Sequence, residues 1–435
     1  MKIALVHDWL VGMRGGERCL EVFCELFPQA DLFTLLHIPG SASPVIEKMS
    51  IKTSFIQNLP FSRKGYRNYL PLFPMAVERF NLKDYDLILS CSHCVAKGIV
   101  PSPKALHISY LLTPMRYAWD MYGEYFGQNG RRMIPLFIHY LRMWDVTSSC
   151  RVDRFPCISK HVASRIMKFY RREAEVIYPP VDTSRFQLRR EKEDFFLMVS
   201  SLVSYKRIDL AVEAFNRLGY PLRVIGSGPE EKNLRLRAES NVTFLGWQPD
   251  ETVADYFSKC RALIFPGEED FGITPVEAMA SGKPVIAYGR GGALETVIPY
   301  DPPTGAERKA PTGIFFQDPS IESLMGAVKR FSEIEKKFDP VAIRSHALQW
   351  DREIFKEKIK RYIFENVETL SVEKNRFSSD PGLSSQTWSS SLKRESFPIQ
   401  IGTRRIRPAP RLHREARGDA EEGGAQDGSS LGRRK

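Results

Sequence analysis

The chain is 435 residues long, which exceeds one ordinary domain and favours two or three. Its composition, with 43% hydrophobic and 26% charged residues, supplies a sizeable core and excludes a wholly disordered chain. The formal net charge of +11 suits anionic ligands such as phosphates, nucleic acid or an acidic membrane face, and does not choose among them.

Three further features bear on the compartment. No apolar run reaches the roughly 18 residues of a transmembrane helix. The beginning of the chain turns polar at His7 and Asp8, too early for a secretory signal peptide. The seven cysteines are an odd number and lie singly in hydrophobic contexts, which is typical of reduced thiols. We therefore expect a cytoplasmic protein.

Short apolar segments alternate with helical patterns along the chain. Strands are predicted first at 2–7, 87–92, 106–111, 155–159 and 174–178, and then at 195–200, 222–225, 242–245, 262–265, 284–288 and 313–316. Helices are predicted at 17–27, 161–170, 209–218, 251–259 and 275–280. Because such alternation builds parallel sheets covered by helices on both faces, we expect an α/β protein with two doubly wound, Rossmann-like domains facing a cleft.

The segment YPPVDTSRF (178–186) interrupts the alternation with two prolines, so the hinge between the domains is placed there. We expect one domain over 1–183, a second over 184–350 and a last helix over 351–370. Residues 371–435, rich in Ser, Gly, Pro and charge, are predicted to be a disordered basic tail. The tail is either inert or an Arg-rich contact for lipid or nucleic acid.

Gly15 and Gly16 follow the first predicted strand and precede a helix. Glycines at a helix start let backbone N–H groups approach a phosphate, and the helix dipole favours the anion; a plain flexible turn is the alternative. The loop is not G-x-G-x-x-G, so no nicotinamide cofactor is indicated.

The strongest signal is PGEEDFGITPVEAMASGKPVIAY (266–288). Glu269 falls in a loop after a strand and Glu277 near the start of a helix, so both carboxylates can face one cleft. Carboxylates are strong acceptors for hydroxyls, which makes sugars natural ligands. The alternative is that Glu277 only satisfies a helix N-terminus.

E-x7-E with an internal F-G, followed by E-A-M-A-x-G-x-P-V-I-A, resembles the signature of glycosyltransferase family 4. LRVIGSGPE (222–230), NVTFLG (241–246) and YKRID (205–209) resemble further segments of that family. The first half, with HDWL, SCSHCVAKG, TPMRYAWD and RVDRF, is similar to mannosyltransferases of O-antigen and exopolysaccharide assembly. The resemblance covers about residues 1–370 and implies the GT-B fold with retaining, sugar-nucleotide-dependent transfer.

The resemblance also implies roles for individual residues. Glu277 would hold the ribose hydroxyls, Glu269 the hydroxyls of the donor sugar, and Lys206 the diphosphate, whose charge grows as the glycosidic bond breaks. The remaining donor-binding residues expected are Gly15, Gly16, Arg207, Gly226, Gly228, Phe271, Gly272 and Ile273. No metal or other cofactor is then required.

Two positions depart from the family pattern. Leu112 replaces a His before T-P-M-R, and Ser201 replaces an Arg before L-V-x-Y-K. The first change removes a polar group near the donor sugar and the second a cation on the diphosphate, unless Arg207, Arg116 or His93 compensates. A non-catalytic homologue that binds sugar nucleotide is therefore an alternative.

His93 ends a predicted strand at the cleft edge, where the resemblance makes it a catalytic candidate and a structural histidine is the alternative. Cys91 and Cys94 flank it as a lone C-x-x-C without further zinc ligands. Asp84 and Asp86 form a D-x-D before an apolar strand, which we interpret as a surface turn. No metal site is predicted.

Residues 61–76 and 131–144 mix arginine and lysine with aromatic side chains. Such faces suit the interface of an anionic membrane, and the alternative is helix packing with a solvated basic edge. No nucleic-acid module accompanies them. The resemblance implies that the first domain is the acceptor side and that the second binds the nucleotide sugar. It also implies transfer of mannose from GDP-mannose to a glycan or lipid-linked acceptor in cell-surface polysaccharide biosynthesis, and with the basic faces we expect this at the inner face of the cytoplasmic membrane. A UDP-sugar donor is the alternative within the same fold. A scaffold tethered by its basic tail to a membrane or RNA is another.

Overall fold

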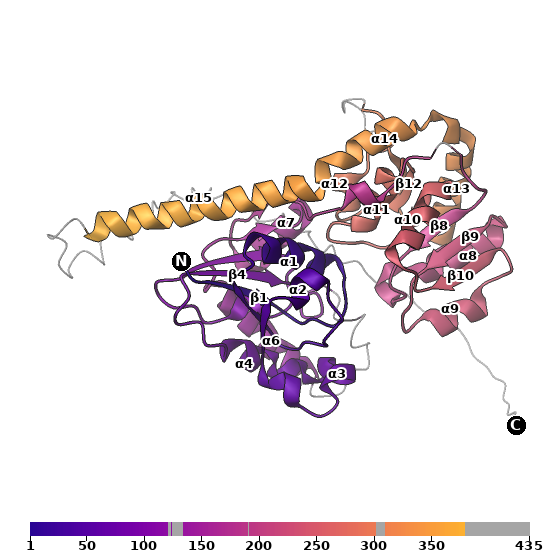
Figure 1. Cartoon of the computed structure of the whole chain (residues 1–435). Coiled ribbons are helices and arrows are strands. Elements are labelled where there is room, and N and C mark those ends of the chain that lie inside the picture. The colour runs from indigo at the N-terminus through magenta and orange to yellow at the C-terminus, as the bar shows by residue number, and fades with distance from the viewer. Residues whose placement is uncertain (121–122, 124–133, 190, 302–308, 379–435) are drawn as a thin grey trace, which may run out of the picture. The chain divides into compact units, whose positions relative to one another are not determined.

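The computed structural model describes residues 1–120, 123, 134–189, 191–301 and 309–378 (Figure 1). Residues 1–375 form one compact unit, which contains two parallel β-sheets. Helices lie against both sheets, and the predicted α/β class is confirmed. Within the described residues, no helix is long and apolar enough to cross a membrane.

The first sheet has seven strands in the order β3-β2-β1-β4-β5-β6-β7. Its strands are β1 (Ile3–His7), β2 (Asp31–Thr34), β3 (Ser50–Thr53), β4 (Leu87–Ser92), β5 (Leu106–Leu111), β6 (Pro156–Cys157) and β7 (Glu175–Val176). Every residue of β4 and β5 is buried, as expected for central strands that are covered by helices on both faces.

The second sheet has six strands in the order β10-β9-β8-β11-β12-β13. They are β8 (Phe196–Val199), β9 (Leu222–Ile225), β10 (Val242–Gly246), β11 (Leu263–Phe265), β12 (Val285–Tyr288) and β13 (Gly313–Phe316). All the pairings in this sheet are parallel. The predicted strands of this half of the chain are all present.

The helices fill the connections between strands. Beside the first sheet they are α1 (Gly15–Leu26), α2 (Pro44–Glu47), α3 (Ser62–Gly65), α4 (Phe73–Glu78), α6 (Ile134–Ser149) and α7 (Lys160–Tyr170). Beside the second they are α8 (Ile208–Leu218), α9 (Glu231–Arg237), α10 (Asp250–Lys259), α11 (Ile273–Ala280), α12 (Ala293–Thr296), α13 (Ile321–Ile334) and α14 (Pro340–Ala347).

Two strands, β2 and β3, were not predicted from the sequence. Each has only four residues, and β3, at the edge of the sheet, is mostly exposed. A short edge strand has no need for an apolar run, because one side of it faces solvent.

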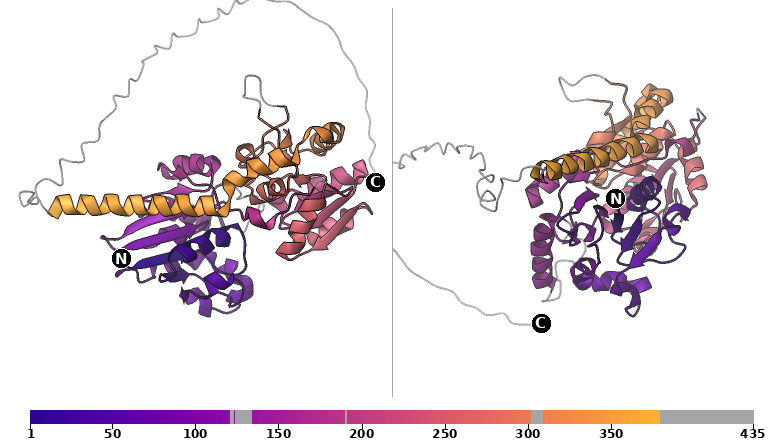
Figure 2. Two further views of the ribbon diagram at one scale, coloured as in Figure 1. Left: turned by 45° about the horizontal axis from the view of Figure 1, so that its top comes forward. Right: turned by 60° about the vertical axis from the view of Figure 1, so that its left-hand side comes forward.

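The last helix, α15 (Arg352–Ser378), follows the second sheet but packs on the first part of the chain (Figures 1 and 2). Arg352 and Lys356 pair with Glu25 of α1, and the ring of Phe355 lies 5.5 Å from that of Tyr110. The chain therefore crosses between the two sheets twice.

The predicted end of this helix at Leu370 is wrong. The helix continues to Ser378, so the first residues of the tail that we predicted to be disordered are helical. Residues 379–435, the rest of that predicted tail, lie outside the described residues.

The strand orders place the loops that matter for function. In the first sheet β1 has β2 on one side and β4 on the other, and in the second β8 lies between β9 and β11. Connections leave in opposite directions at these points, which opens a crevice at the carboxyl ends of the strands, where ligands of doubly wound sheets bind.

Candidate functional site

A cavity of about 700 Å³ lies at these switch points, between loops that follow β1, β4 and β5 and loops that follow β8 and β11. Its first-sheet lining includes Trp9, Arg14, Gly15, Gly16, Glu17, Arg67, Asn68, Leu70, Phe73, His93, Leu112, Thr113, Arg116 and Tyr117. Its second-sheet lining is Val199, Ser200, Ser201, Tyr205, Lys206, Glu269, Asp270, Phe271, Gly272, Ile273 and Thr274. The cavity is large enough for a ligand of nucleotide-sugar size.

The cavity brings together eight residues that the sequence predicted for the site. They are Gly15, Gly16, His93, Lys206, Glu269, Phe271, Gly272 and Ile273. They come from four separate loops and from both halves of the chain, and the structure brings them to one cavity. Their roles in binding and catalysis stay predictions.

Lys206 and Glu269 form an ion pair between Nζ and Oε1 inside the cavity. Lys206 ends a 3₁₀ turn (Ser204–Lys206) after β8, and Glu269 lies in the loop between β11 and α11. Their side chains keep 17% and 20% of their exposure, so both face the cavity rather than the core. The arrangement offers one cation for a phosphate and one carboxylate for hydroxyl groups at adjacent points.

Gly15 and Gly16 let two elements approach each other. A Cβ on Gly15 would lie 2.9 Å from Cδ1 of Ile273, and a Cβ on Gly16 would lie 2.8 Å from Cδ1 of Leu112. The start of α1 therefore lies against α11 of the second half of the chain, and both glycines line the cavity, where no side chain of their own covers the backbone.

Gly226 and Gly228, two of the predicted donor-binding residues, do not line the cavity. A Cβ on Gly226 would lie 1.9 Å from the carbonyl oxygen of Ser200, and one on Gly228 would lie 2.3 Å from that of Leu202. The structure gives these glycines a packing role: they let the loop after β9 lie against the loop after β8.

Glu277 and Arg207 also lie outside the cavity lining. Arg207 approaches Asp209, with 3.4 Å between Nε and Oδ1. Burial raises the pKa of Glu277, and the charges of Arg18 and Arg185 partly offset this effect. Glu277 thus faces two cations, which are themselves paired with Asp250.

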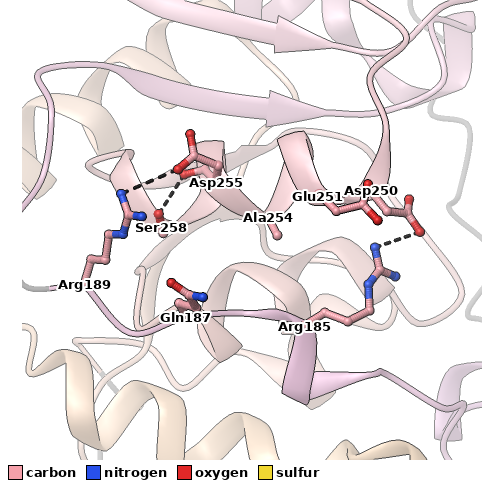
Figure 3. Close-up of a pocket in the computed structure, with 8 residues that line it drawn as sticks. All are labelled: Arg185, Gln187, Arg189, Asp250, Glu251, Ala254, Asp255 and Ser258. Atoms are coloured by element: carbon pink, nitrogen blue, oxygen red, sulfur yellow. Dashed lines mark hydrogen bonds and ion pairs between the residues drawn. The ribbon is translucent and has the colours of Figure 1, made fainter.

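A second hollow of about 330 Å³ lies beside these cations (Figure 3). Arg185 and Arg189 of the connecting segment point across it to α10 and pair with Asp250 and Asp255 (Figure 3). Its lining holds these two arginines and three carboxylates, because Glu251 also lines it, so it carries no excess of positive charge for an anion.

Asp8, which sequence reasoning did not select, holds the loop that carries His93. Its fully buried carboxylate accepts the backbone N–H groups of residues 93, 94, 95 and 96 at 2.6–3.0 Å. Nδ1 of His93 lies 3.1 Å from Oδ2 of Asp8. Burial lowers the pKa of His93, so its imidazole is neutral near pH 7.

His7 and Glu17 form a second buried pair that the sequence did not reveal. Nε2 of His7 lies 3.4 Å from Oε1 of Glu17, while its Nδ1 donates to the carbonyl of Cys91. Burial lowers the pKa of His7, but the hydrogen bond and charge of Glu17 outweigh it and raise that pKa overall. The pair ties the start of α1 to the end of β1.

Asp270, also missed, joins the two halves of the chain next to Glu269. It accepts from Nε of Arg116 and from Nη1 of Arg165, each at 2.8 Å. Burial acts to raise the pKa of Asp270, and the two arginine charges outweigh it, so this pKa is lowered. The Asp in E-D-F-G and the Arg in T-P-M-R were the available signals, but their pairing depends on the fold.

The two departures from the family pattern both lie in the cavity wall. Leu112 presents a methyl group toward Gly16, and Ser201 is exposed. Of the three residues proposed to compensate, Arg116 and His93 line the cavity and Arg207 does not. Arg116 is paired with Asp270, as Lys206 is with Glu269. Among the second-sheet residues that line the cavity, Lys206 is the cation that could meet a diphosphate.

Within the described residues, no cluster of three or more His, Cys, Asp or Glu side chains is placed to hold a metal ion. Asp86 of the D-x-D accepts the backbone N–H of Lys2 at 2.7 Å, at the opposite end of the strands from the cavity.

Two doubly wound parallel sheets that meet one cavity at their switch points define the GT-B architecture. Residues 181–343 match the family model described as "Glycosyl transferases group 1", so the chain carries a glycosyltransferase domain of that family. This span contains Lys206, Glu269 and Glu277.

Similar proteins agree with this assignment. The D-rhamnosyltransferase WbpZ of Pseudomonas aeruginosa is 32% identical over 31% of this chain and 41% of its own length. The O-antigen chain mannosyltransferase C of Escherichia coli is 34% identical over 22% of this chain and 28% of its own length. The chain thus spans less than half the length of each of these relatives. The crystal structure of Anabaena Alr3699/HepE in complex with UDP has a TM-score of 0.60 at 16% identity, and covers 84% of this chain and all of its own.

Proposed function

We propose that this protein is a retaining glycosyltransferase that transfers mannose from GDP-mannose to a hydroxyl of a glycan or lipid-linked oligosaccharide in cell-surface polysaccharide biosynthesis. The observation that carries the proposal is the Lys206–Glu269 pair in the cavity at the switch points of two sheets. The mannosyl- and rhamnosyltransferase relatives support a manno-configured sugar.

In this proposal Lys206 stabilises the nucleoside diphosphate as it leaves. Negative charge grows on the diphosphate when the bond from the anomeric carbon to the phosphate oxygen breaks, and a fixed cation directed at developing charge lowers the barrier. Glu269 orients the donor sugar through its hydroxyls, and the backbone N–H groups of Gly15, Gly16, Phe271 and Gly272 add hydrogen bonds. No metal or other cofactor enters the proposed reaction.

Glu277 holds the ribose in the proposal, although it lies outside the lining of the cavity. Arg18 and Arg185 face its carboxylate from α1 and from the connecting segment. The nucleotide then extends from Lys206 along α11 toward Glu277. This direction keeps the base on the second-sheet side of the protein.

Peripheral contact with the inner face of the cytoplasmic membrane is part of the proposal. Phe61 is 88% exposed beside Arg63 and Lys64, and Leu136, Tyr140 and Met143 form an exposed stripe along α6. Apolar side chains next to cations suit an anionic lipid surface. Residues 131–133 of the predicted contact lie outside the described residues.

The experiment that tests the donor assignment is calorimetric titration of the full chain with GDP-mannose, GDP, UDP-glucose and UDP, in the presence of a chelator. Preferential binding of the GDP compounds supports the proposal. Preference for the UDP compounds retains the reaction and changes the donor, an outcome that the UDP complex of the structural relative makes worth testing.

Turnover is tested separately. Product formation with a mannosylated acceptor, and loss of it in Glu269→Gln at unchanged stability, supports the catalytic assignment, and the anomeric configuration of the product tests retention. Nucleotide binding without turnover on any acceptor favours the non-catalytic homologue, for which Leu112 and Ser201 are the motivation.

A further inference from the structure

The two ends of the cavity differ in the state of their charges. At the second-sheet end each lining carboxylate has a cationic partner: Glu269 pairs with Lys206, and Asp270 pairs with Arg116 and Arg165. Both carboxylates at that end are thus neutralised before any ligand enters, and Arg165 also pairs with Asp120.

The first-sheet end carries guanidinium groups that no carboxylate neutralises. Arg14 and Arg67 line the cavity there and are exposed. Among the described residues, no ion pair joins either side chain to an Asp or Glu. The guanidinium of Arg67 lies 5.6 Å from the ring centroid of Tyr66, a contact that orients the cation and leaves its charge uncompensated. The carboxylate of Glu17, also in the lining, is engaged by His7 and by the backbone N–H of Arg14.

An aromatic surface adjoins Arg67, whose guanidinium lies against the ring of Tyr66. Trp9 is partly exposed and lines the cavity, and it is held by three rings: Tyr66 at 5.2 Å, Phe73 at 5.9 Å and the edge of His93 at 4.5 Å. Because the ring is fixed by packing, little entropy is lost when a ligand stacks on it. The C–H face of a pyranose is apolar and fits such a surface, and the polar side chains of Asn68 and His93 line the same cavity.

We propose that this first-sheet end is an acceptor subsite for a saccharide that carries an anionic phosphoester beside the sugar that receives the transfer. Trp9 supports the sugar ring, and Arg67 with Arg14 binds the phosphoester. The inference rests on the proposed function and deepens it, because it names the chemical class of the acceptor.

The uncompensated charge supports a second anion in this place, separate from the donor diphosphate that Lys206 is proposed to bind. A charge-assisted contact between guanidinium and phosphate contributes about 1.5–3 kcal/mol, which is roughly ten- to a hundredfold in affinity. A neutral acceptor would leave both guanidinium groups without this gain. The reaction step is unchanged: the acceptor oxygen bonds to the anomeric carbon, the bond from that carbon to the phosphate oxygen breaks with its electron pair going to the nucleoside diphosphate, and the proton of the acceptor hydroxyl passes to an oxygen of that leaving diphosphate.

The test compares two synthetic acceptors that share one mannosyl unit and one alkyl chain, joined through a neutral glycoside or through a phosphodiester. Steady-state kinetics with the full chain are measured for wild type, Arg67→Ala, Arg14→Ala and Trp9→Leu. We expect a KM at least about tenfold lower for the phosphodiester in wild type. We expect this preference to disappear in Arg67→Ala while the KM for the neutral acceptor stays the same.

Arg63→Ala is the matched control, because Arg63 is an exposed arginine on the neighbouring α3 and does not line the cavity. It should retain the full preference for the phosphodiester.

Donor affinity, measured by calorimetry on each variant, separates the acceptor subsite from the proposed glycosyl transfer. Equal KM values for the two acceptors in wild type overturn the subsite while glycosyl transfer stands. A loss of donor affinity in Arg67→Ala equal to its loss of acceptor affinity also overturns it, because Arg67 would then serve the nucleotide. If Trp9→Leu unfolds, the arginine variants still decide. Soluble acceptors exclude a lipid surface as the source of the effect.

Discussion

Replacement of Gly226 by alanine should destabilise the protein through one backbone contact. Gly226 has a φ of 133°, and a Cβ there would lie 1.9 Å from the carbonyl oxygen of Ser200. Backbone hydrogen bonds surround this point: the N–H of Gly226 donates to Gly246 at 2.8 Å, and that of Ser200 donates to Ile225 at 3.0 Å. No rotation of a side chain can relieve the contact.

The expected cost can be estimated from these parts. A non-glycine residue in such a conformation costs about 1–3 kcal/mol. Separating the two loops to make room for the methyl group lengthens the two hydrogen bonds, at about 0.5–1.5 kcal/mol each. We expect a total loss of about 4 kcal/mol in the free energy of unfolding of the second half of the chain.

Gly219→Ala is the control for this experiment. Gly219 also has a positive φ, 71°, but nothing lies within 4 Å of the position of its Cβ, so alanine there should cost only about 1–2 kcal/mol of conformational strain. Urea unfolding followed by fluorescence, with nucleotide titration of the folded proteins, measures both effects. If Gly226→Ala is no less stable than Gly219→Ala and instead loses nucleotide binding, the packing role is refuted and the predicted donor contact is restored.

Three further predictions concern charge. Lys206→Ala should lower kcat/KM by about ten- to a hundredfold. Arg207→Ala, at the adjacent position outside the cavity lining, should change kcat/KM by less than about threefold. Equal effects of the two substitutions in steady-state assays would contradict the role of Lys206. Glu277→Ala should remove most activity and weaken nucleotide binding, because its carboxylate is the acceptor proposed for the ribose; unchanged kinetics and calorimetry would refute this site. His107 is fully buried, and burial lowers its pKa from 6.5 to about 4. The unfolded chain therefore takes up this proton at a higher pH than the folded chain, and the free energy of unfolding falls as the pH drops from about 6.5 to 4. The pH dependence of urea midpoints should show this loss, at most about 3 kcal/mol, and it should be reduced in His107→Asn.

The central strands β4 and β5, buried along their whole length, were predicted correctly. Burial alone does not decide the outcome, because the partly exposed β7 was also predicted and the mostly buried β2 was missed. Central strands such as β4 and β5 must be apolar throughout, so the sequence marks them clearly. Strand β3 carries Ser, Lys and Thr at the sheet edge and gives no such signal. The end of α15 was misplaced because its last turns are polar and resemble the tail that follows.

The residues of the site divide in a similar way. Lys206 and Glu269 lie in sequence motifs whose charged side chains indicate a binding site, and both line the cavity. Asp8 looks like any polar residue after a strand, since its four amide partners are 85–88 positions away in the chain. Gly226 could be selected from the sequence, but its role could not. The motif indicates that a glycine is needed there and does not tell whether a ligand or a neighbouring carbonyl requires it.

The two crossings of the chain between the sheets are joined to each other. The N–H of Val181 donates to Trp350 at 3.1 Å, and the N–H of Arg352 donates back to Val181 at 2.9 Å. A single crossing of the chain would let the two halves rotate about the axis of that segment. Two strands bonded side by side behave as a flat strap, which bends across its width and resists torsion. Any opening of the cavity should therefore follow one rotational degree of freedom, and the loops after β8 and β11 should return to the same alignment with Gly15 and Gly16 in every cycle.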